Sequence, residues 1–231
     1  MELADVDSAL IECRRCPRLV EWRERIAAEK RAAFAGEEYW GRPVPGFGDP
    51  DARLVVVGLA PAAHGANRTG RMFTGDRSGD WLFRALHRAG FANRPTSEHA
   101  GDGLELTDCY VTSVVHCAPP GNRPTAEERR ECGRWLELTF AGLSAAEVVV
   151  ALGGVAHTEM MRLAARIGWD PPRPRPRFSH GGEVTLRGGP RVVGSYHPSQ
   201  QNTFTGRLTE PMLDAVFGRA RRLLSQFPLR P

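Results

Sequence analysis

The sequence predicts an α/β fold, a three-layer αβα sandwich around a small, mostly parallel central sheet. The apolar, β-branched run at 54–57 is typical of a short buried strand, and two further strands are predicted at 108–115 and 146–152. Predicted helices alternate with these strands, and such alternation indicates a parallel sheet between two helix layers. The chain has neither an internal repeat nor a clear domain boundary, so we expect a single domain over residues 1–231.

Composition narrows the classes of protein that the chain can belong to. Of its 231 residues, 41% are hydrophobic and 25% are charged, which is an ordinary globular composition. A net charge of +4 is compatible with a nucleic-acid partner but does not by itself indicate one. The N-terminal residues are acidic rather than apolar, and no apolar run is long enough to cross a bilayer. We therefore expect a soluble, cytoplasmic protein.

Residues 1–50 are predicted to form a helical N-terminal segment. A short helix at 3–12 leads into the sequence C-R-R-C at 13–16. A second helix, at 17–35, begins at a proline, which suits the first turn of a helix. The turn-rich stretch 37–50 follows, and we expect its aromatic side chains to cover one edge of the core.

The loop after the strand at 54–57 is the stretch around which we expect the rest of the chain to be organised. It runs from Gly58 to Asp76, is rich in Gly, Pro and Asn, and precedes a helix that begins near Ser78. Open α/β sheets bind ligands where a loop follows a strand in this way. Phe73 is the only aromatic residue in the loop and is placed to stack on a ring. The glycine spacing matches neither a dinucleotide-binding fingerprint nor a P-loop.

The rest of the chain continues the alternation of strands and helices. The rigid loop C-A-P-P-G-N-R-P follows the second strand, and Thr125 caps the next helix. A stiff connector rich in Pro and Arg, at 170–177, precedes two strands that we expect to pair antiparallel. The predicted elements after the strand at 108–115 are a helix at 125–143, a strand at 146–152, a helix at 153–167, strands at 183–186 and 191–196, and a helix at 205–227.

Four of the five cysteines have the spacing of a metal-binding set. Cys13 and Cys16 form a C-x-x-C pair, and Cys117 and Cys132 form a distant second pair. Four thiolates suit either structural zinc or a [4Fe–4S] cluster, and the spacing does not separate the two. A third possibility is that these cysteines are buried without a ligand. Cys109 lies inside a predicted strand, where we expect it to be part of the core.

Three stretches, in this order, resemble the motifs of the uracil-DNA glycosylase superfamily. They are G-L-A-P-A-A-H-G-A-N-R-T-G-R-M-F-T-G-D at 58–76, C-A-P-P-G-N-R-P-T at 117–125, and S-Y-H-P-S-Q-Q-N-T-F-T-G-R-L-T at 195–209. The long first loop and Ala60 are similar to those of the family 5 branch. The resemblance extends over nearly the whole chain, from Cys13 to about Leu224.

This resemblance implies an enzyme, a monofunctional DNA glycosylase of base-excision repair. Resemblance to family 5 implies that it flips and excises uracil, and also hypoxanthine, xanthine and some etheno adducts, from double-stranded DNA. It further implies a [4Fe–4S] cluster on Cys13, Cys16, Cys117 and Cys132, with the structural role of stapling the N-terminal segment. The protein is then expected to be a monomer that works at a prokaryotic nucleoid. No motif contains a lysine, so we do not expect a Schiff-base lyase step.

The resemblance also assigns roles to individual residues. Asp76 would orient a water or stabilise the cationic sugar, Asn122 would bind the base or a water, and His197 would donate to a carbonyl oxygen of the leaving base. Each could instead have a purely structural role, as a helix N-cap, a turn residue, and a capping or core histidine, respectively. The expected base contacts are Gly58, Leu59, Ala60 and Phe73. The expected DNA contacts are Arg68, Arg71, Arg123, Gln200, Gln201, Asn202 and Arg207, and residues 199–207 are expected to act as a wedge in the DNA.

Ala60 departs from the rest of the superfamily, where a polar or acidic residue often activates water. Family 5 shares this alanine, so it is compatible with activity, but it implies that another group positions the water. A protein of the same fold but a different activity would belong to the branch that binds uracil covalently through a histidine, although the basic K-R-R-I-H insertion of that branch is absent here. Two further classes are compatible with the cysteines and the loops: a non-catalytic iron–sulfur protein that binds DNA, and a zinc-stapled nucleotide-binding module.

Overall fold

A mixed sheet forms the centre of the computed structural model, which describes residues 2–226. Its strands lie in the order β1-β3-β2-β4-β6-β5; the four central strands are parallel and each edge strand is antiparallel to its neighbour. The strands are β1 (Phe47–Gly48), β2 (Leu54–Gly58), β3 (Cys109–Ser113), β4 (Val148–Leu152), β5 (Glu183–Thr185) and β6 (Arg191–Ser195). The predicted, mostly parallel sheet is confirmed, as is the antiparallel pairing of the last two strands.

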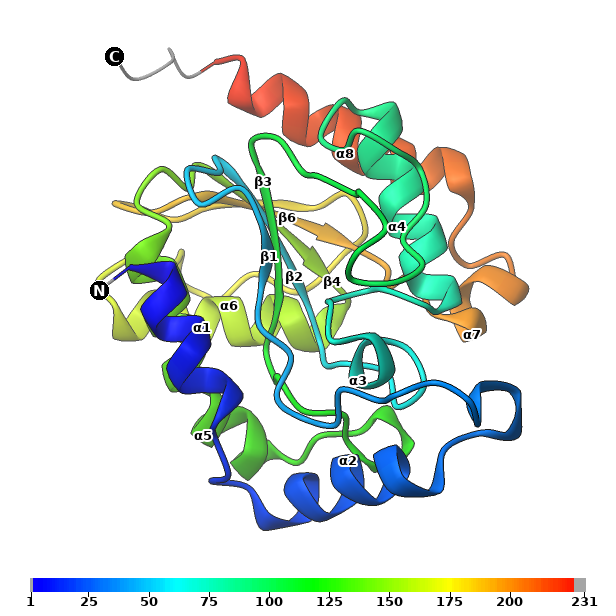
Figure 1. The fold of residues 1–231 in the computed structure, drawn as a ribbon. Coiled ribbons are helices and arrows are strands. Elements are labelled where there is room, and N and C mark those ends of the chain that lie inside the picture. The colour runs from blue at the N-terminus through cyan, green and yellow to red at the C-terminus, as the bar shows by residue number, and fades with distance from the viewer. Residues whose placement is uncertain (1, 227–231) are drawn as a thin grey trace.

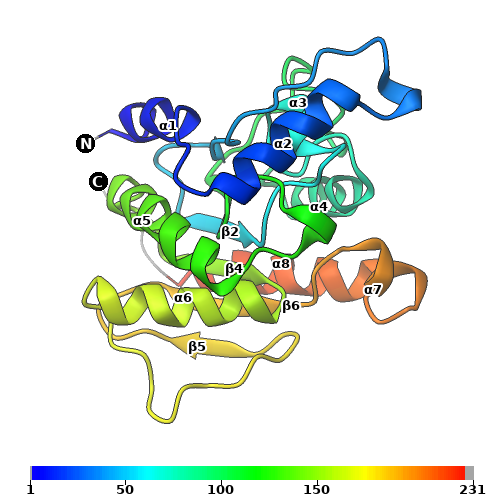
Figure 2. The same ribbon diagram turned by 90° about the horizontal axis from the view of Figure 1, so that it is seen from below.

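Helices cover both faces of this sheet (Figures 1 and 2). On one face α4 packs against α8, and on the other face α5 packs against α1 and α6. The helices are α1 (Leu3–Ile11), α2 (Pro17–Glu29), α3 (Ala66–Thr69), α4 (Arg77–Arg88), α5 (Ala126–Gly142), α6 (Gly154–Arg166), α7 (Gln200–Phe204) and α8 (Glu210–Leu224). The three-layer αβα architecture predicted from the sequence is therefore confirmed. No helix among residues 2–226 is long and apolar enough to reach across a membrane.

Strand β2 shows why the central strands have uninterrupted apolar sequences. Leu54 and Val56 belong to the core cluster beneath α4 and α8, whereas Val55 and Val57 belong to the cluster beneath α5 and α6. All four side chains are fully buried. A parallel strand covered on both faces needs apolar residues at successive positions, because neither face meets water.

The second predicted helix is shorter than expected. Helix α2 ends at Glu29, whereas the sequence predicts a helix at 17–35. Lys30 adopts a left-handed φ of 56°, which is incompatible with continuing the helix, and a short 3₁₀ helix, η1 (Ala32–Phe34), follows it.

The last predicted helix, at 205–227, begins later than expected. Helix α8 starts at Glu210, and the preceding turn contains Gly206 with a left-handed φ of 70°. A separate short helix, α7, lies before that turn. The predicted end of this helix at Phe227 lies outside the described residues. Strand β1 and helix α3 are not predicted, because two- and four-residue elements carry no readable periodicity.

Candidate active site

The predicted site lies along the edge of the sheet where the parallel strands end. Since β2, β3, β4 and β6 run in the same direction, their carboxyl ends meet at one edge. The loops that carry the three motifs leave the sheet from three of these ends, at Gly58, Ser113 and Ser195. This edge is where open α/β sheets bind their ligands.

The first motif loop is folded back onto the sheet and holds Phe73 in a defined position. The Phe73 ring lies over Gly58, where a Cβ atom would come within 2.6 Å of the ring. Its carbonyl oxygen touches Gly79 of α4, where a Cβ atom would be only 1.7 Å away. Phe73 itself has a left-handed φ of 54° and its side chain is largely buried. Two close contacts that only glycine permits therefore position the ring.

His197, from the loop after β6, lies beside Phe73. The two ring centroids are 5.9 Å apart and the ring planes are inclined by 30°. Burial lowers the pKa of His197 to about 4, so its imidazole is neutral at pH 7. The side-chain amide of Asn202 donates to the backbone carbonyl of His197 at 2.8 Å and holds the loop. A neutral imidazole in this position can donate one hydrogen bond to a flat polar ring that lies on Phe73.

The backbone just after β2 supplies further polar groups at this edge. The carbonyl oxygen of Leu59 accepts from the N–H of Val115 at 3.0 Å. The N–H groups of Leu59 and Ala60 have no acceptor within the described part of the chain. Both residues are half-buried. Their N–H groups are therefore available to the polar edge of a ligand.

Asp76 is the N-cap of α4. Its Oδ1 accepts from the N–H of Gly79 at 3.1 Å, and its Oδ2 lies where a Cβ atom on Gly65 would be 2.2 Å away. Burial raises the pKa of Asp76, while hydrogen bonds from the backbone of Gly79 and Ser78 act in the opposite direction. Asp76 therefore does cap the helix, which is the structural role considered for it. The cap uses one of its two carboxylate oxygens.

Arg68 and Arg71 are buried, although the sequence analysis predicts that they contact DNA phosphates. The guanidinium of Arg71 donates to Asp102 at 2.7 Å and to Ser97 at 2.8 Å. Arg68 pairs with Glu37 and donates to the carbonyl oxygen of His64 at 2.8 Å. With their donors engaged inside the protein, these arginines support the first motif loop instead of facing a phosphate. We correct their assignment accordingly.

The segment predicted to act as a DNA wedge contains the exposed helix α7. Its polar residues Gln200, Gln201 and Arg207 are exposed, and Asn202 is half-buried. Phe204 is 67% exposed, an unusual exposure for an aromatic side chain, and the guanidinium of Arg77 lies 4.6 Å from the centre of its ring. Figure 2 shows α7 at one extreme of the molecule. Phe204 is the one aromatic residue of the predicted wedge but is not among the predicted DNA contacts, and Arg77 carries no signal in the sequence.

Asn122 and Arg123 lie on an exposed turn after β3. Asn122 ends the 3₁₀ turn η2 (Pro120–Asn122), and both Gly121 and Asn122 have left-handed φ values, of 58° and 56°. This conformation agrees with the role of a turn residue for Asn122. Within residues 2–226, the Asn122 side chain forms no hydrogen bond with Asp76 or His197, so the structure leaves it facing solvent.

The four cysteines of the predicted set line one pocket. Cys13 and Cys16 come from the connection between α1 and α2, Cys117 from the loop after β3, and Cys132 from α5. Among the described residues, no three His, Cys, Asp or Glu side chains converge as ligands of a single metal ion would. Cys109 lies apart from the pocket, fully buried in β3, as predicted.

Two N–H donors point at sulfur atoms of this pocket. Nη1 of Arg23 donates to Sγ of Cys117 at 3.1 Å, and the backbone N–H of His116 donates to Sγ of Cys132 at 3.4 Å. Burial raises the pKa of both thiols, whereas these hydrogen bonds act in the opposite direction and favour the thiolate form. A set of four cysteines with N–H donors on the sulfurs fits an iron–sulfur cluster. Arg23 has no sequence signal, because its long-range contact exists only in the folded chain.

Comparison with known proteins gives consistent matches over most of the chain. The family described as the Uracil DNA glycosylase superfamily matches residues 45–221. A protein of Mycobacterium tuberculosis named type-5 uracil-DNA glycosylase is 54% identical over 96% of this chain and 81% of its own length. The type-5 uracil-DNA glycosylase of Thermus thermophilus is 51% identical over 93% and 94% of the two chains. A type-4 uracil-DNA glycosylase of Thermotoga maritima is 32% identical over 68% and 69%.

Proposed function

The chain belongs to the uracil-DNA glycosylase superfamily, and we infer that it is a uracil-DNA glycosylase, an enzyme that hydrolyses the bond between uracil and deoxyribose in DNA. We assign the site from one observation: the rings of Phe73 and His197 lie side by side at the carboxyl edge of the sheet. A pyrimidine flipped out of the helix and placed on Phe73 has a carbonyl oxygen within the reach of a neutral histidine.

The same edge provides stabilisation for the leaving base. When the glycosidic bond breaks, negative charge develops on the carbonyl oxygens of uracil. His197, whose pKa of about 4 keeps it neutral, donates to one of these oxygens, and the free N–H groups of Leu59 and Ala60 bind the edge of the base. Donors that are already in place when charge develops lower the barrier, because they need no reorganisation.

We assign Asp76 to the sugar side of the reaction. As the base departs, the deoxyribose acquires cationic character, and a carboxylate stabilises a nearby cation. One oxygen of Asp76 caps α4, which fixes the position of the other. Ala60 cannot activate water, so the mechanism relies on departure of the base as the difficult step and capture of water as the easy one.

Helix α7 is proposed to enter the DNA stack when the base leaves it. Phe204 is the exposed apolar side chain that this role requires, and the guanidinium of Arg77 holds its ring. Arg207, over the ring of Tyr196 at 4.6 Å, and the exposed Arg123 are proposed as phosphate contacts. Gln200, Gln201 and Asn202 remain proposed contacts of the same segment.

We also propose that Cys13, Cys16, Cys117 and Cys132 hold a [4Fe–4S] cluster. Each thiolate of such a cluster binds a different iron, so the sulfurs need not converge on one point as they do around zinc. The proposal is supported by the four cysteines that line one pocket and by the N–H donors at two of their sulfurs. When bound, the cluster supplies a covalent tie between the N-terminal segment and α5.

Cys117→Ser is expected to lose iron and the absorbance at about 400 nm, whereas Cys109→Ser should keep both. Zinc without iron in anaerobically purified protein would contradict the assignment.

We further propose a wider range of substrates and a cellular setting. Hypoxanthine, xanthine and some etheno adducts are flat bases that fit the same stacking position on Phe73. The enzyme is proposed to act as a monomer on double-stranded DNA at a prokaryotic nucleoid, and to lack lyase activity, since Lys30, the single lysine of the chain, lies at the end of α2.

The test is to incubate the protein with matched duplexes that differ only in one base. Uracil, hypoxanthine, xanthine and an etheno base are each placed opposite the same partner, and an undamaged duplex serves as the control. We expect abasic sites from the duplex with uracil and from the other damaged bases, and none from the control. No abasic site from uracil would refute the activity, and abasic sites from uracil alone would refute the wider range.

A further inference from the structure

A single arginine, Arg23, is buried beside the cysteine pocket with no dedicated carboxylate partner. Its side chain is 1% exposed. Nη1 donates to Sγ of Cys117 at 3.1 Å, and Nη2 donates to the carbonyl oxygen of Cys13 at 3.3 Å. The nearest carboxylate, that of Glu24, is 3.6 Å from Nη2. Glu24 is partly exposed and is held by Arg14, so it is not dedicated to Arg23.

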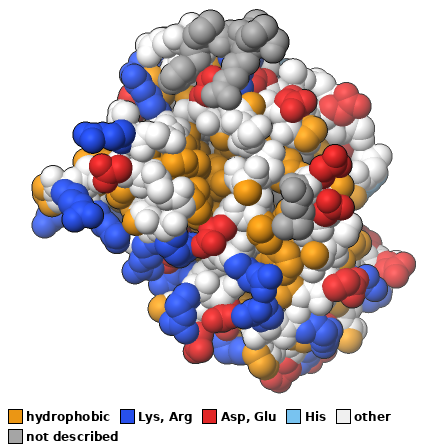
Figure 3. Space-filling model, turned by 90° about the vertical axis from the view of Figure 1, so that its left-hand side faces the viewer, with side chains coloured by type: hydrophobic (Ala, Val, Ile, Leu, Met, Phe, Trp, Pro, Cys, Tyr) orange, Lys and Arg blue, Asp and Glu red, His pale blue; other side chains and the backbone are white. Residues whose placement is uncertain are grey.

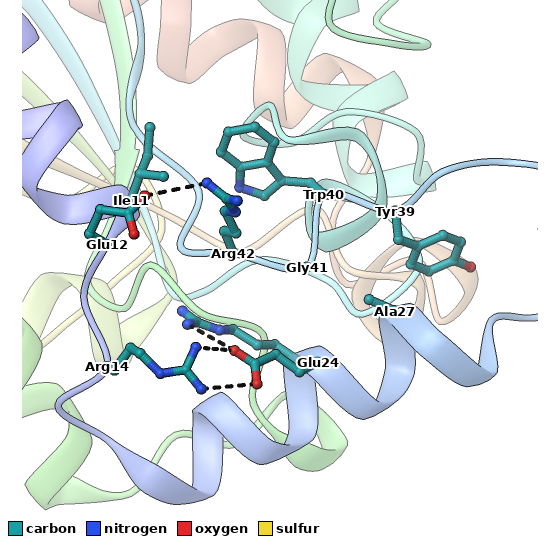
Figure 4. Close-up of a pocket in the computed structure, with 10 residues that line it drawn as sticks. Ile11, Glu12, Arg14, Glu24, Ala27, Tyr39, Trp40, Gly41 and Arg42 are labelled. Carbon is teal, nitrogen blue, oxygen red and sulfur yellow. Dashed lines mark hydrogen bonds and ion pairs between the residues drawn. The ribbon is translucent and has the colours of Figure 1, made fainter.

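The pocket in Figure 4 lies on the solvent side of this arginine. Arg14 and Glu24 pair on one wall of the pocket, and Arg42 pairs with Glu12 on another. Nε of Arg23 has no protein partner. The guanidinium lies between the rim of the pocket, where Glu24 is 3.6 Å from Nη2, and the sulfur of Cys117, to which Nη1 donates. A buried guanidinium needs a negative partner, because an uncompensated buried charge is strongly destabilising.

We propose that Arg23 is the counter-charge of the iron–sulfur cluster, holding it in the protein through the sulfur of Cys117. The inference rests on the proposed cluster. Four thiolates around a [4Fe–4S] core leave a net negative charge, whereas neutral thiols would offer Arg23 only weak acceptors. The guanidinium therefore stabilises the loaded state of the pocket by charge and by a directed N–H···S bond.

Arg23 also lies between the cysteine pocket and the first motif loop. The side-chain amide of Asn67, in α3, donates to the backbone carbonyl of Arg23 at 3.3 Å. Asn67 is fully buried. Helix α2 is thus fixed on one side to a cluster ligand and on the other to the loop that carries Phe73. Arg23 is a positioning residue, since it contacts neither the base nor the sugar in this arrangement.

The test is the rate at which the loaded protein loses iron to a chelator, followed by the absorbance of the cluster. Arg23→Met fills similar space without charge, and Arg23→Lys keeps the charge without the planar fork. We expect iron release from Arg23→Met to be about ten- to a hundredfold faster than from the wild type. The rate of iron release from Arg23→Lys should lie clearly between those of the wild type and Arg23→Met. Lysine and methionine fill similar space, so a difference between these two variants reports the charge. Arg14→Met is the matched control, since Arg14 and Arg23 both line the pocket of Figure 4, and it should release iron at the wild-type rate.

Two results would overturn the proposal. Release from Arg23→Met at the wild-type rate would show that the arginine does not hold the cluster. Equal acceleration in Arg23→Met and Arg23→Lys would show that shape matters and charge does not. Either result leaves the cluster itself in place, whereas wild-type protein that contains no iron when purified anaerobically would instead refute the cofactor on which the inference rests.

Discussion

Asp76 combines two roles that a single substitution can separate. Asn caps helices about as well as Asp, so Asp76→Asn should retain the hydrogen bond to Gly79 and the stability of the fold. If the carboxylate stabilises the cationic sugar, the single-turnover rate of uracil excision should fall by roughly ten- to a thousandfold, with nearly unchanged affinity for DNA. Excision at close to the wild-type rate would leave Asp76 with the helix cap alone.

The loss of excision rate on replacing His197 is predicted to depend on which base is excised. Hypoxanthine lacks the pyrimidine C2 carbonyl, so a donor placed at that oxygen should matter more for uracil. Removing one such donor costs on the order of 3 kcal/mol, or about a hundredfold in rate. His197→Ala should therefore slow uracil release by about this factor and hypoxanthine release by less. Equal losses on both bases would place the action of His197 on the sugar, the water or the loop.

At the scale of single elements, helix α7 presents the exposed aromatic side chain of Phe204, which we propose enters the DNA stack. Phe204→Ala should slow excision of uracil from duplex DNA by roughly tenfold, because the empty place in the stack is no longer filled. Excision from single-stranded DNA should change less, since no base pair has to open there. Phe204→Leu should restore most of the duplex activity. Equal losses on single- and double-stranded DNA would argue against a wedge.

The central elements were predictable from sequence because each carries a strong local signal. Strands β2, β3 and β4 are buried on both faces, and Thr125 forms a capping box with Glu128 at the start of α5. The break after α2 was not predictable, since Lys30 adopts a left-handed φ that nothing in its residue type indicates.

The site was predictable where a motif places residues at the end of a strand, and not where burial decides. Phe73 and His197 come together as the motifs suggest. Arg68 and Arg71 lie in the same motif, yet their partners Glu37 and Asp102 are far away in sequence. From sequence, an arginine in a loop is expected to lie on the surface, and only the folded structure shows a carboxylate partner that is distant in sequence. Arg23 was missed for the same reason, as its partner is the sulfur of Cys117.

Across the described part of the molecule, many acidic and basic side chains form ion pairs. The side that faces the viewer in Figure 3, away from α7 in Figure 1, carries both acidic and basic side chains. Many arginines are neutralised by ion pairs, such as those of Arg53 with Asp108 and of Arg129 with Glu159. The net charge of +4 is therefore less informative than the position of exposed arginines such as Arg123 and Arg207, which form no ion pair within residues 2–226.

Histidines with a lowered pKa make the stability of the whole protein sensitive to acid. Burial lowers the pKa of His64, His157, His180 and His197, the last from 6.5 to about 4. At His197 the unfolded chain therefore takes up a proton below about pH 6.5, whereas the folded chain does not until about pH 4, so stability falls as the pH falls through this window. His197 alone should account for about 1–2 kcal/mol of the free energy of unfolding between pH 7 and pH 5.

Urea unfolding at pH 7 and pH 5 measures this dependence. His197→Gln should remove a corresponding part of it, while the exposed His99→Gln should leave it unchanged. A variant His197→Gln with the full wild-type dependence on pH would show that this histidine is protonated in the folded protein at pH 5.

The most direct test of the central claim is to identify the products from a uracil-containing duplex at an excess of enzyme. Hydrolysis at the site of Phe73 and His197 predicts one free uracil for each uracil in the DNA, an abasic strand that stays unbroken until alkali is added, and no protein attached to DNA after denaturation. Absence of free uracil, or a protein–DNA adduct that survives denaturation, would contradict it.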